Sequence, residues 1–158
     1  MELQLCGHND LYAVEQLQMS LFSTEETGEA VSRLFRGKVW LTAVTVICRN
    51  GKTTRGVRRM KVSEENVRQR RQILQQSYYA AALEHLPQRP EWGAISGVRP
   101  TKITTKLLQQ GETRSSAKKL LRDVYYVSDS RAELAADCSV ATVRAAEKLN
   151  DRDISLYV

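Results

Sequence analysis

Basic side chains gathered in one stretch are the residues with the clearest chemical potential. Residues 49–71 hold nine lysines or arginines against two glutamates, a local charge of +7 in a 158-residue chain whose net charge is +6. Such a stretch predicts a local surface that attracts anions. Guanidinium groups bind carboxylates and phosphates through paired hydrogen bonds. We therefore take Arg55, Arg58 and Arg59 as candidate anion ligands.

Thiol and imidazole groups form no comparable cluster. Cys6, Cys48 and Cys138 lie far apart, without a C-x-x-C pair, and the two histidines stand alone. A zinc site or an iron-sulfur cluster needs several ligands at close spacing. The sequence thus predicts no metal site, no cofactor and no catalytic residue within this chain.

Apolar periodicity predicts the elements that position the basic residues. A strand is expected over 1–5, a helix from Asn9 or Asp10 to about 23, and a loop over 23–37. Residues 38–48 are typical of a buried strand, and Asn50-Gly51 turns the chain into a second strand over 53–62. Its many charges favour an edge strand. A helix from Ser63 to before Pro87 completes a βαββα unit.

The composition changes at Pro87 and Pro90, which favours a boundary there. The predicted class is α+β, with an α+β unit over 1–87 and a helical subdomain over 88–152. Three helices are expected to begin near Thr101, Ser115 and Ser130. No apolar run reaches the length of a membrane span and no secretory signal is visible, so we expect a cytoplasmic protein without membrane contact.

The densest motif is Trp92-Gly93-Ala94-Ile95-Ser96-Gly97-Val98-Arg99-Pro100-Thr101-Lys102. Its glycines allow the backbone to fold closely under a tryptophan. Arg99 and Lys102, at the start of a helix, offer donors to an anion and join the candidate ligands. The alternative is that Trp92 fills a core between the subdomains and that Arg99 pairs locally.

This W-G-A-x-x-G-V-R-P-T-K segment resembles the region just ahead of the radical SAM domain in the coproporphyrinogen dehydrogenase branch of the oxygen-independent coproporphyrinogen III oxidase family. Residues 125–128 (Y-Y-V-S) and 154–158 (I-S-L-Y-V) are similar to that family as well. In the family, the closing strand leads to G-I-P-F-C-x-x-x-C-x-x-C, whose cysteines hold a 4Fe-4S cluster that cleaves S-adenosylmethionine. This chain ends one residue short of that motif.

The resemblance implies a non-catalytic N-terminal accessory domain of a radical SAM oxidoreductase of porphyrin (haem) biosynthesis. Residues 153–158 would be the first strand of the missing barrel, and that barrel would be the main partner. The 4Fe-4S cluster and S-adenosylmethionine would belong to the parent enzyme and not to this chain.

Three interpretations of the basic stretch stay open. It could assist a polycarboxylate substrate, an anionic tetrapyrrole such as coproporphyrinogen, whose propionates arginine can grip. It could belong to a basic α+β nucleic-acid-binding module, as the pI near 9.4 allows, although aromatic residues that stack bases are scarce beside it. It could also be the solvated face of a purely structural cover for the barrel.

Overall fold

A computed structural model describes residues 1–23 and 27–148 of the chain. They form two compact units, Met1–Gly97 and a second that begins at Val98. The predicted α+β class is confirmed. We predicted the boundary at residue 87, and the structure instead groups 88–97 with the first unit.

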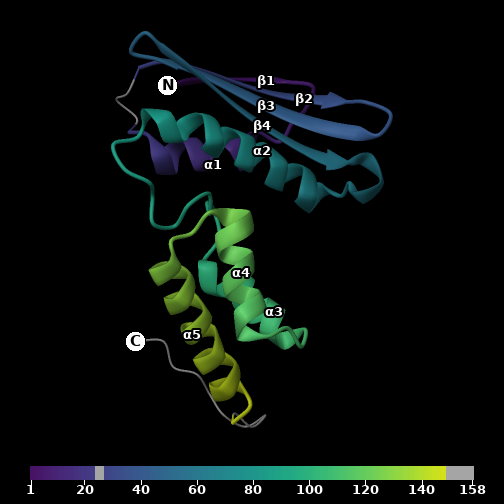
Figure 1. The fold of residues 1–158 in the computed structure, drawn as a ribbon, viewed down its shortest axis with the longest axis vertical. Helices are drawn as coiled ribbons and strands as arrows, with labels where there is room; N and C mark the ends of the chain where they lie inside the picture. Colours follow the sequence, from purple (N-terminus) through teal and green to yellow (C-terminus); the bar gives the residue numbers. More distant parts are fainter. Residues whose placement is uncertain (24–26, 149–158) are drawn as a thin grey trace. The chain divides into compact units, whose positions relative to one another are not determined.

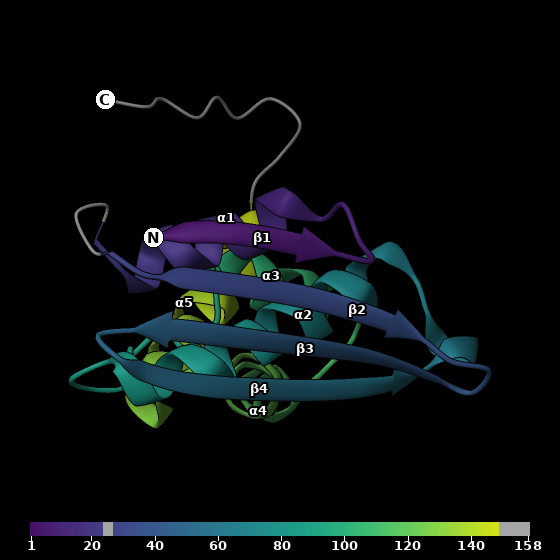
Figure 2. The same ribbon diagram turned by 90° about the horizontal axis from the view of Figure 1, so that it is seen from above.

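A four-stranded sheet organises the first unit (Figures 1 and 2). Its strands are β1 (Glu2–Cys6), β2 (Glu29–Arg36), β3 (Trp40–Arg49) and β4 (Lys52–Lys61), in the spatial order β1-β2-β3-β4. β1 is parallel to β2, and the other two pairs are antiparallel. Parallel neighbours need a crossover connection, and helix α1 (Leu11–Leu21) lies within it.

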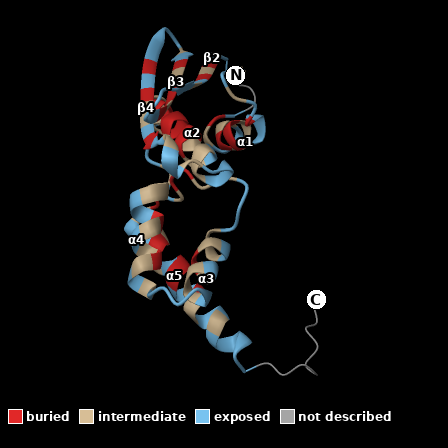
Figure 3. Cartoon of the chain, turned by 90° about the vertical axis from the view of Figure 1, so that its right-hand side faces the viewer, coloured by how far each residue is buried: buried red, intermediate tan, exposed pale blue. Residues whose placement is uncertain are grey.

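Helices α1 and α2 (Val67–Ala82) both lie on the same side of this sheet (Figure 1). Strand side chains alternate between the faces, so one half of them meets the helices. This inner face and the helices contribute the fully buried side chains of Leu17, Leu41, Ile47, Leu74 and Tyr78. Figure 3 shows the buried residues between the sheet and its helices.

Hydrogen bonds also join α2 to the inner face. The hydroxyl oxygens of Thr45 and Ser77 are 3.0 Å apart, and the Thr54 hydroxyl donates to the Ala81 carbonyl at 2.7 Å. Because both contacts are buried, they satisfy polar groups that would otherwise lose their hydrogen bonds to water.

Three helices make up the described part of the second unit: α3 (Pro100–Gln109), α4 (Arg114–Tyr125) and α5 (Asp129–Ala146). α5 packs against both of the others. Its buried side is built from small residues, and Leu121 of α4 is fully buried. Arg114 pairs with Glu133 and, at 2.7 Å, with Asp137, which ties the first turn of α4 to α5.

The predicted hairpin between the strands over 38–48 and 53–62 is confirmed, and so is the edge position of its second strand. Asn50 and Gly51 have φ angles of +51° and +74°, as a tight turn between two strands requires, and β4 lies at an edge of the sheet. The helical character of the second unit is confirmed as well.

Three local predictions differ from the structure. The predicted loop over 23–37 contains β2, whose alternation is hidden because Ser32 points into the core while Phe35 is exposed. The helix predicted from Ser63 begins at Val67, since the Asn66 side chain caps it by accepting from the Gln69 amide. Ser128, rather than Ser130, caps α5. The strand predicted over 153–158 lies outside the described residues.

Among the described residues, no helix combines the length and apolar character that crossing a bilayer requires.

Candidate functional site

The face of the sheet opposite α1 and α2 is covered by no helix of the described first unit (Figures 1 and 2). We call it the open face. Because neighbouring strands are in register, side chains on it form rungs across the sheet. The rungs across β2, β3 and β4 are Glu29–Cys48–Thr53, Val31–Val46–Arg55, Arg33–Val44–Val57 and Phe35–Thr42–Arg59, and Trp40 and Lys61 follow on β3 and β4.

Two large aromatic side chains stand on the open face. Phe35 on β2 is 54% exposed and Trp40 on β3 is 47% exposed. Phe35 lies opposite Thr42, two residues along β3 from Trp40, so the two aromatics are diagonal neighbours. Sequence reasoning missed both, because Phe35 fell in a predicted loop and Trp40 in a strand expected to be buried.

Basic side chains surround these aromatics. Arg59 lies on the rung of Phe35, Lys61 pairs with Trp40, and Arg33 and Arg55 lie on the next two rungs. Arg33, Arg55, Arg59 and Lys61 are all exposed. None of the four forms an ion pair with the part of the chain that the structure describes.

The five predicted anion ligands do not share one surface of the first unit. Arg55 and Arg59 lie on the open face, whereas Arg58 follows the opposite phase of the strand and donates from Nη1 to the Val57 carbonyl at 2.8 Å. Arg99 is the residue before α3 and Lys102 lies in its first turn, so both belong to the second unit. Within the first unit, only Arg55 and Arg59 of this set share a face.

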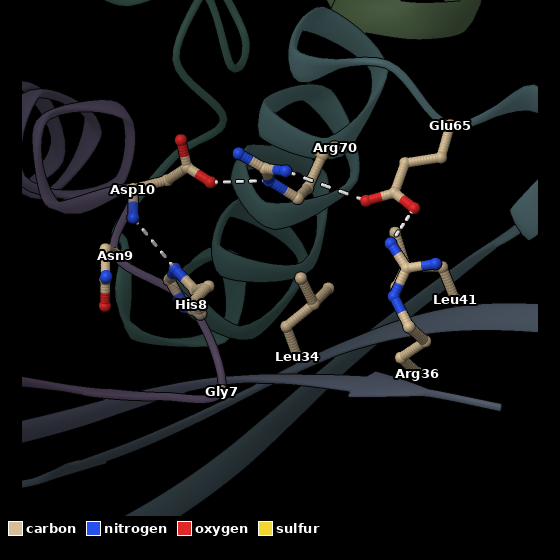
Figure 4. A pocket seen from close by; sticks show the side chains of 9 residues that line it. All are labelled: Gly7, His8, Asn9, Asp10, Leu34, Arg36, Leu41, Glu65 and Arg70. Carbon is tan, nitrogen blue, oxygen red and sulfur yellow. Dashed lines mark hydrogen bonds and ion pairs between the residues drawn. The ribbon is translucent and has the colours of Figure 1, made fainter.

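A polar cleft of about 620 Å³ opens where β1 ends (Figure 4). Its charged side chains form a chain of ion pairs. Asp10 accepts from Nε of Arg70 at 2.8 Å and from Nε of Arg71 at 3.0 Å. Arg70 reaches Glu65 at 3.6 Å, and Glu65 also pairs with Arg36. These pairs connect α2 to β2 and to the start of α1.

His8 lines this cleft, and both of its ring nitrogens are engaged. Nδ1 accepts from the Asp10 backbone amide at 3.3 Å, while Nε2 lies 3.1 Å from the Ser32 hydroxyl and 3.3 Å from the Ser32 carbonyl. A carbonyl only accepts, so Nε2 carries the proton. Burial lowers the pKa of His8, which favours this neutral form. His8 therefore holds the end of β1 against β2, and its geometry does not suit a general base.

Asp10 makes the first unit sensitive to acid. Burial alone would raise the pKa of Asp10, but hydrogen bonds and charges from Arg70 and Arg71 outweigh it and hold this pKa below its ordinary value. Asp10 therefore stabilises the fold fully above the unfolded pKa, about 4, and this contribution is lost as the pH falls through the lower folded pKa.

We expect Asp10→Asn to reduce the free energy of unfolding by about 1–2 kcal/mol at pH 7, because one charge-assisted hydrogen bond loses its charge and the other is lost, since the amide nitrogen cannot accept from an arginine. The deficit should shrink at pH 3 and below. Urea unfolding at pH 7 and at pH 3 measures this deficit in the free energy of unfolding, with Glu29→Gln as an exposed acidic control. A deficit that stays constant down to pH 2 would contradict this role.

The three cysteines lie on three separate elements. All are exposed, and they come from β1, β3 and α5. Within residues 1–23 and 27–148, no three His, Cys, Asp or Glu side chains gather as metal ligands.

The first unit is thus an α+β domain that presents one open sheet face, rich in basic and aromatic residues. No protein-family model matches the chain, and no curated protein or solved structure matches it either.

Proposed function

We propose that this chain is the non-catalytic N-terminal part of a radical SAM enzyme similar to coproporphyrinogen dehydrogenase. In this proposal it flanks the catalytic barrel of the parent enzyme in the cytoplasm and helps to retain an anionic tetrapyrrole. The observation that carries it is the W-G-A-x-x-G-V-R-P-T-K segment, residues 92–102.

The backbone of this segment supports treating it as a specific motif. Gly93 and Gly97 have φ angles of +57° and +69°, which lie in a backbone region that residues other than glycine rarely adopt. Ala94 is buried, and Pro100 occupies the first turn of α3, where its missing amide costs no hydrogen bond. The motif runs from the end of the first unit into α3 and so connects the two units along the chain.

The charges support a role with a polycarboxylate. Coproporphyrinogen carries four propionates, and exposed arginines that form no ion pair with residues 1–23 and 27–148, such as Arg55 and Arg59, can donate hydrogen bonds to carboxylates. Arg99 and Lys102 offer a second basic group at the start of α3. The 4Fe-4S cluster and S-adenosylmethionine would bind in the barrel, and no reaction step is assigned to the residues of this chain.

The reading frame that encodes this chain provides the first test. We expect G-I-P-F-C-x-x-x-C-x-x-C directly after Val158. A stop codon, or a following domain without clustered cysteines, would contradict the proposal.

Binding of coproporphyrin III, a fluorescent and air-stable oxidation product of the substrate, provides the second test. Replacing Arg55 and Arg59 together by Ser should weaken this binding by about tenfold, since charged donors to the propionates are lost. The matched control replaces Lys106 and Lys119 by Ser, which removes the same charge from exposed positions of the second unit. Equal losses in both variants would show that only net charge matters and would oppose a specific role.

A further inference from the structure

We propose that the open face of the first unit binds single-stranded nucleic acid. In this arrangement, Phe35 and Trp40 stack on bases while Arg33, Arg55, Arg59 and Lys61 contact phosphates. The inference goes beyond the proposed function and does not depend on it.

The aromatic residues provide the first line of support. Burial of aromatic surface is strongly favourable, yet Phe35 and Trp40 remain half exposed on two central strands. Diagonal neighbours across an antiparallel pair lie about 7–8 Å apart. At this spacing each ring can accept one base from a strand whose bases are splayed apart. Two adjacent stacking positions are therefore present.

The distribution of charge on the open face provides the second line of support. Arg55, Arg59 and Lys61 follow one face of β4 over six residue steps, which correspond to about 20 Å. Arg33 lies on β2, which is on the other side of β3 from these residues. The acidic residues of this face, Glu2 and Glu29, share a rung at the end away from the aromatics. The cations thus flank the aromatic pair and match an extended polyanion.

The shape of the face favours a flexible strand over the other occupants. The two cavities described in the first unit lie at the end of β1 and beside α1, so neither opens onto Phe35 and Trp40. A tetrapyrrole held by Arg55 and Arg59 would be bound through its propionates alone, because neither of these cavities encloses its ring at this face. A second copy of this chain would bring its own four cations against these four, and like charges disfavour that contact.

Fluorescence anisotropy of a labelled 12-nucleotide oligouridylate, titrated with the 158-residue chain, tests the proposal. Four phosphate contacts predict a slope of about −3 in a plot of log K against log salt, at about −0.7 per contact on a single strand. Quenching of tryptophan fluorescence should accompany binding. Replacing Trp40 by Ala should abolish that quenching, leaving the signal of Trp92.

Two double variants separate stacking from charge. Phe35→Ala with Trp40→Ala should weaken binding at least tenfold without changing the salt slope, because base stacking is lost while the phosphate contacts remain. Arg59→Ser with Lys61→Ser should weaken binding and reduce the magnitude of the slope by about 1.4.

Their matched controls are Tyr12→Ala, an aromatic of α1 that is 64% exposed, and Lys106→Ser with Lys119→Ser on the second unit. Both controls should bind nearly as the unaltered chain does. Circular dichroism shows whether each variant is folded. If the aromatic variant does not fold, the comparison of Arg59→Ser with Lys61→Ser against its lysine control still tests the proposal.

Two outcomes would overturn the assignment. The first is binding that depends on net charge alone, with equal losses in variants and controls and no tryptophan quenching. The second is absence of oligonucleotide binding while coproporphyrin III, or self-association measured by sedimentation, responds to the Phe35 and Trp40 substitutions.

Discussion

Replacing Gly56 by Ala should destabilise the first unit by about 3 kcal/mol or more, which is a large effect for one added methyl group. A Cβ atom at this position would lie 1.9 Å from the Ser77 carbonyl oxygen and 2.7 Å from the Ala81 nitrogen. Both are backbone atoms of α2, so no side-chain rotation relieves the clash. The helix must move away from β4.

That movement would also weaken the contacts beside it. The Thr45–Ser77 and Thr54–Ala81 hydrogen bonds lie next to Gly56 in the same interface. Urea unfolding followed by circular dichroism measures the effect, with Thr53→Ala, an exposed position of β4, as the control. A Gly56→Ala variant as stable as this control would show that the close approach of α2 to β4 is not present in solution.

Leu74→Ala should lower the free energy of unfolding by about 2–5 kcal/mol. Leu74 is fully buried and lies three residues before Ser77, whose hydroxyl meets Thr45 of β3, so both side chains are on the side of α2 that faces the sheet. Truncation removes its apolar contacts and leaves a cavity that the surrounding helix and strands fill only in part.

Val67→Ala is the matched control, because Val67 belongs to the same helix and is 52% exposed. It should cost less than about 1 kcal/mol, and the slope of unfolding free energy against urea should stay unchanged in both variants. A Leu74→Ala variant that unfolds at the same urea concentration as Val67→Ala would refute the described core.

Substitutions at Gly56 and Leu74 can also be compared with those on the open face in binding experiments. α1 and α2 occupy one face of the sheet, and their packing against that face leaves the other one open. Substitutions at Gly56 or Leu74 should therefore alter ligand binding only through unfolding. Exchange of Arg59 or Lys61 should alter binding with little change in stability, since exposed charges contribute little to the free energy of unfolding.

Local signals in the sequence were sufficient for several elements. Asn50-Gly51 specified a turn because few other residue pairs adopt two positive φ angles. The charges of 53–62 favoured an edge strand, since charged side chains at a sheet edge discourage pairing with another chain. The α+β class followed from the change between β-branched and helical patterns along the chain.

The start of α2 shows where a local signal was ambiguous. Ser63 and Asn66 are both good capping residues, and Glu64 and Glu65 suit a first helical turn. In the structure Val62–Glu64 forms a 3₁₀ turn, and Asn66 accepts the hydrogen bond of the Gln69 amide. Glu65 instead pairs with Arg36 and Arg70. The later start of α2 is thus accompanied by the ion pair between Glu65 and Arg36 of β2, a strand distant in the sequence.

The basic stretch was determined by sequence alone, but the open face was decided only by the tertiary structure. The number of charges near β4 is a property of composition, whereas the side on which each lies depends on strand phase. Arg55 and Arg59 share a face, and Arg58 does not, because side chains alternate along a strand. The partners of these residues depend on β2, a strand whose buried Ser32 and exposed Phe35 hide its alternation. Pairing of β2 with β3 is what makes Phe35 a neighbour of Trp40, since register is fixed by long-range packing and not by any local pattern.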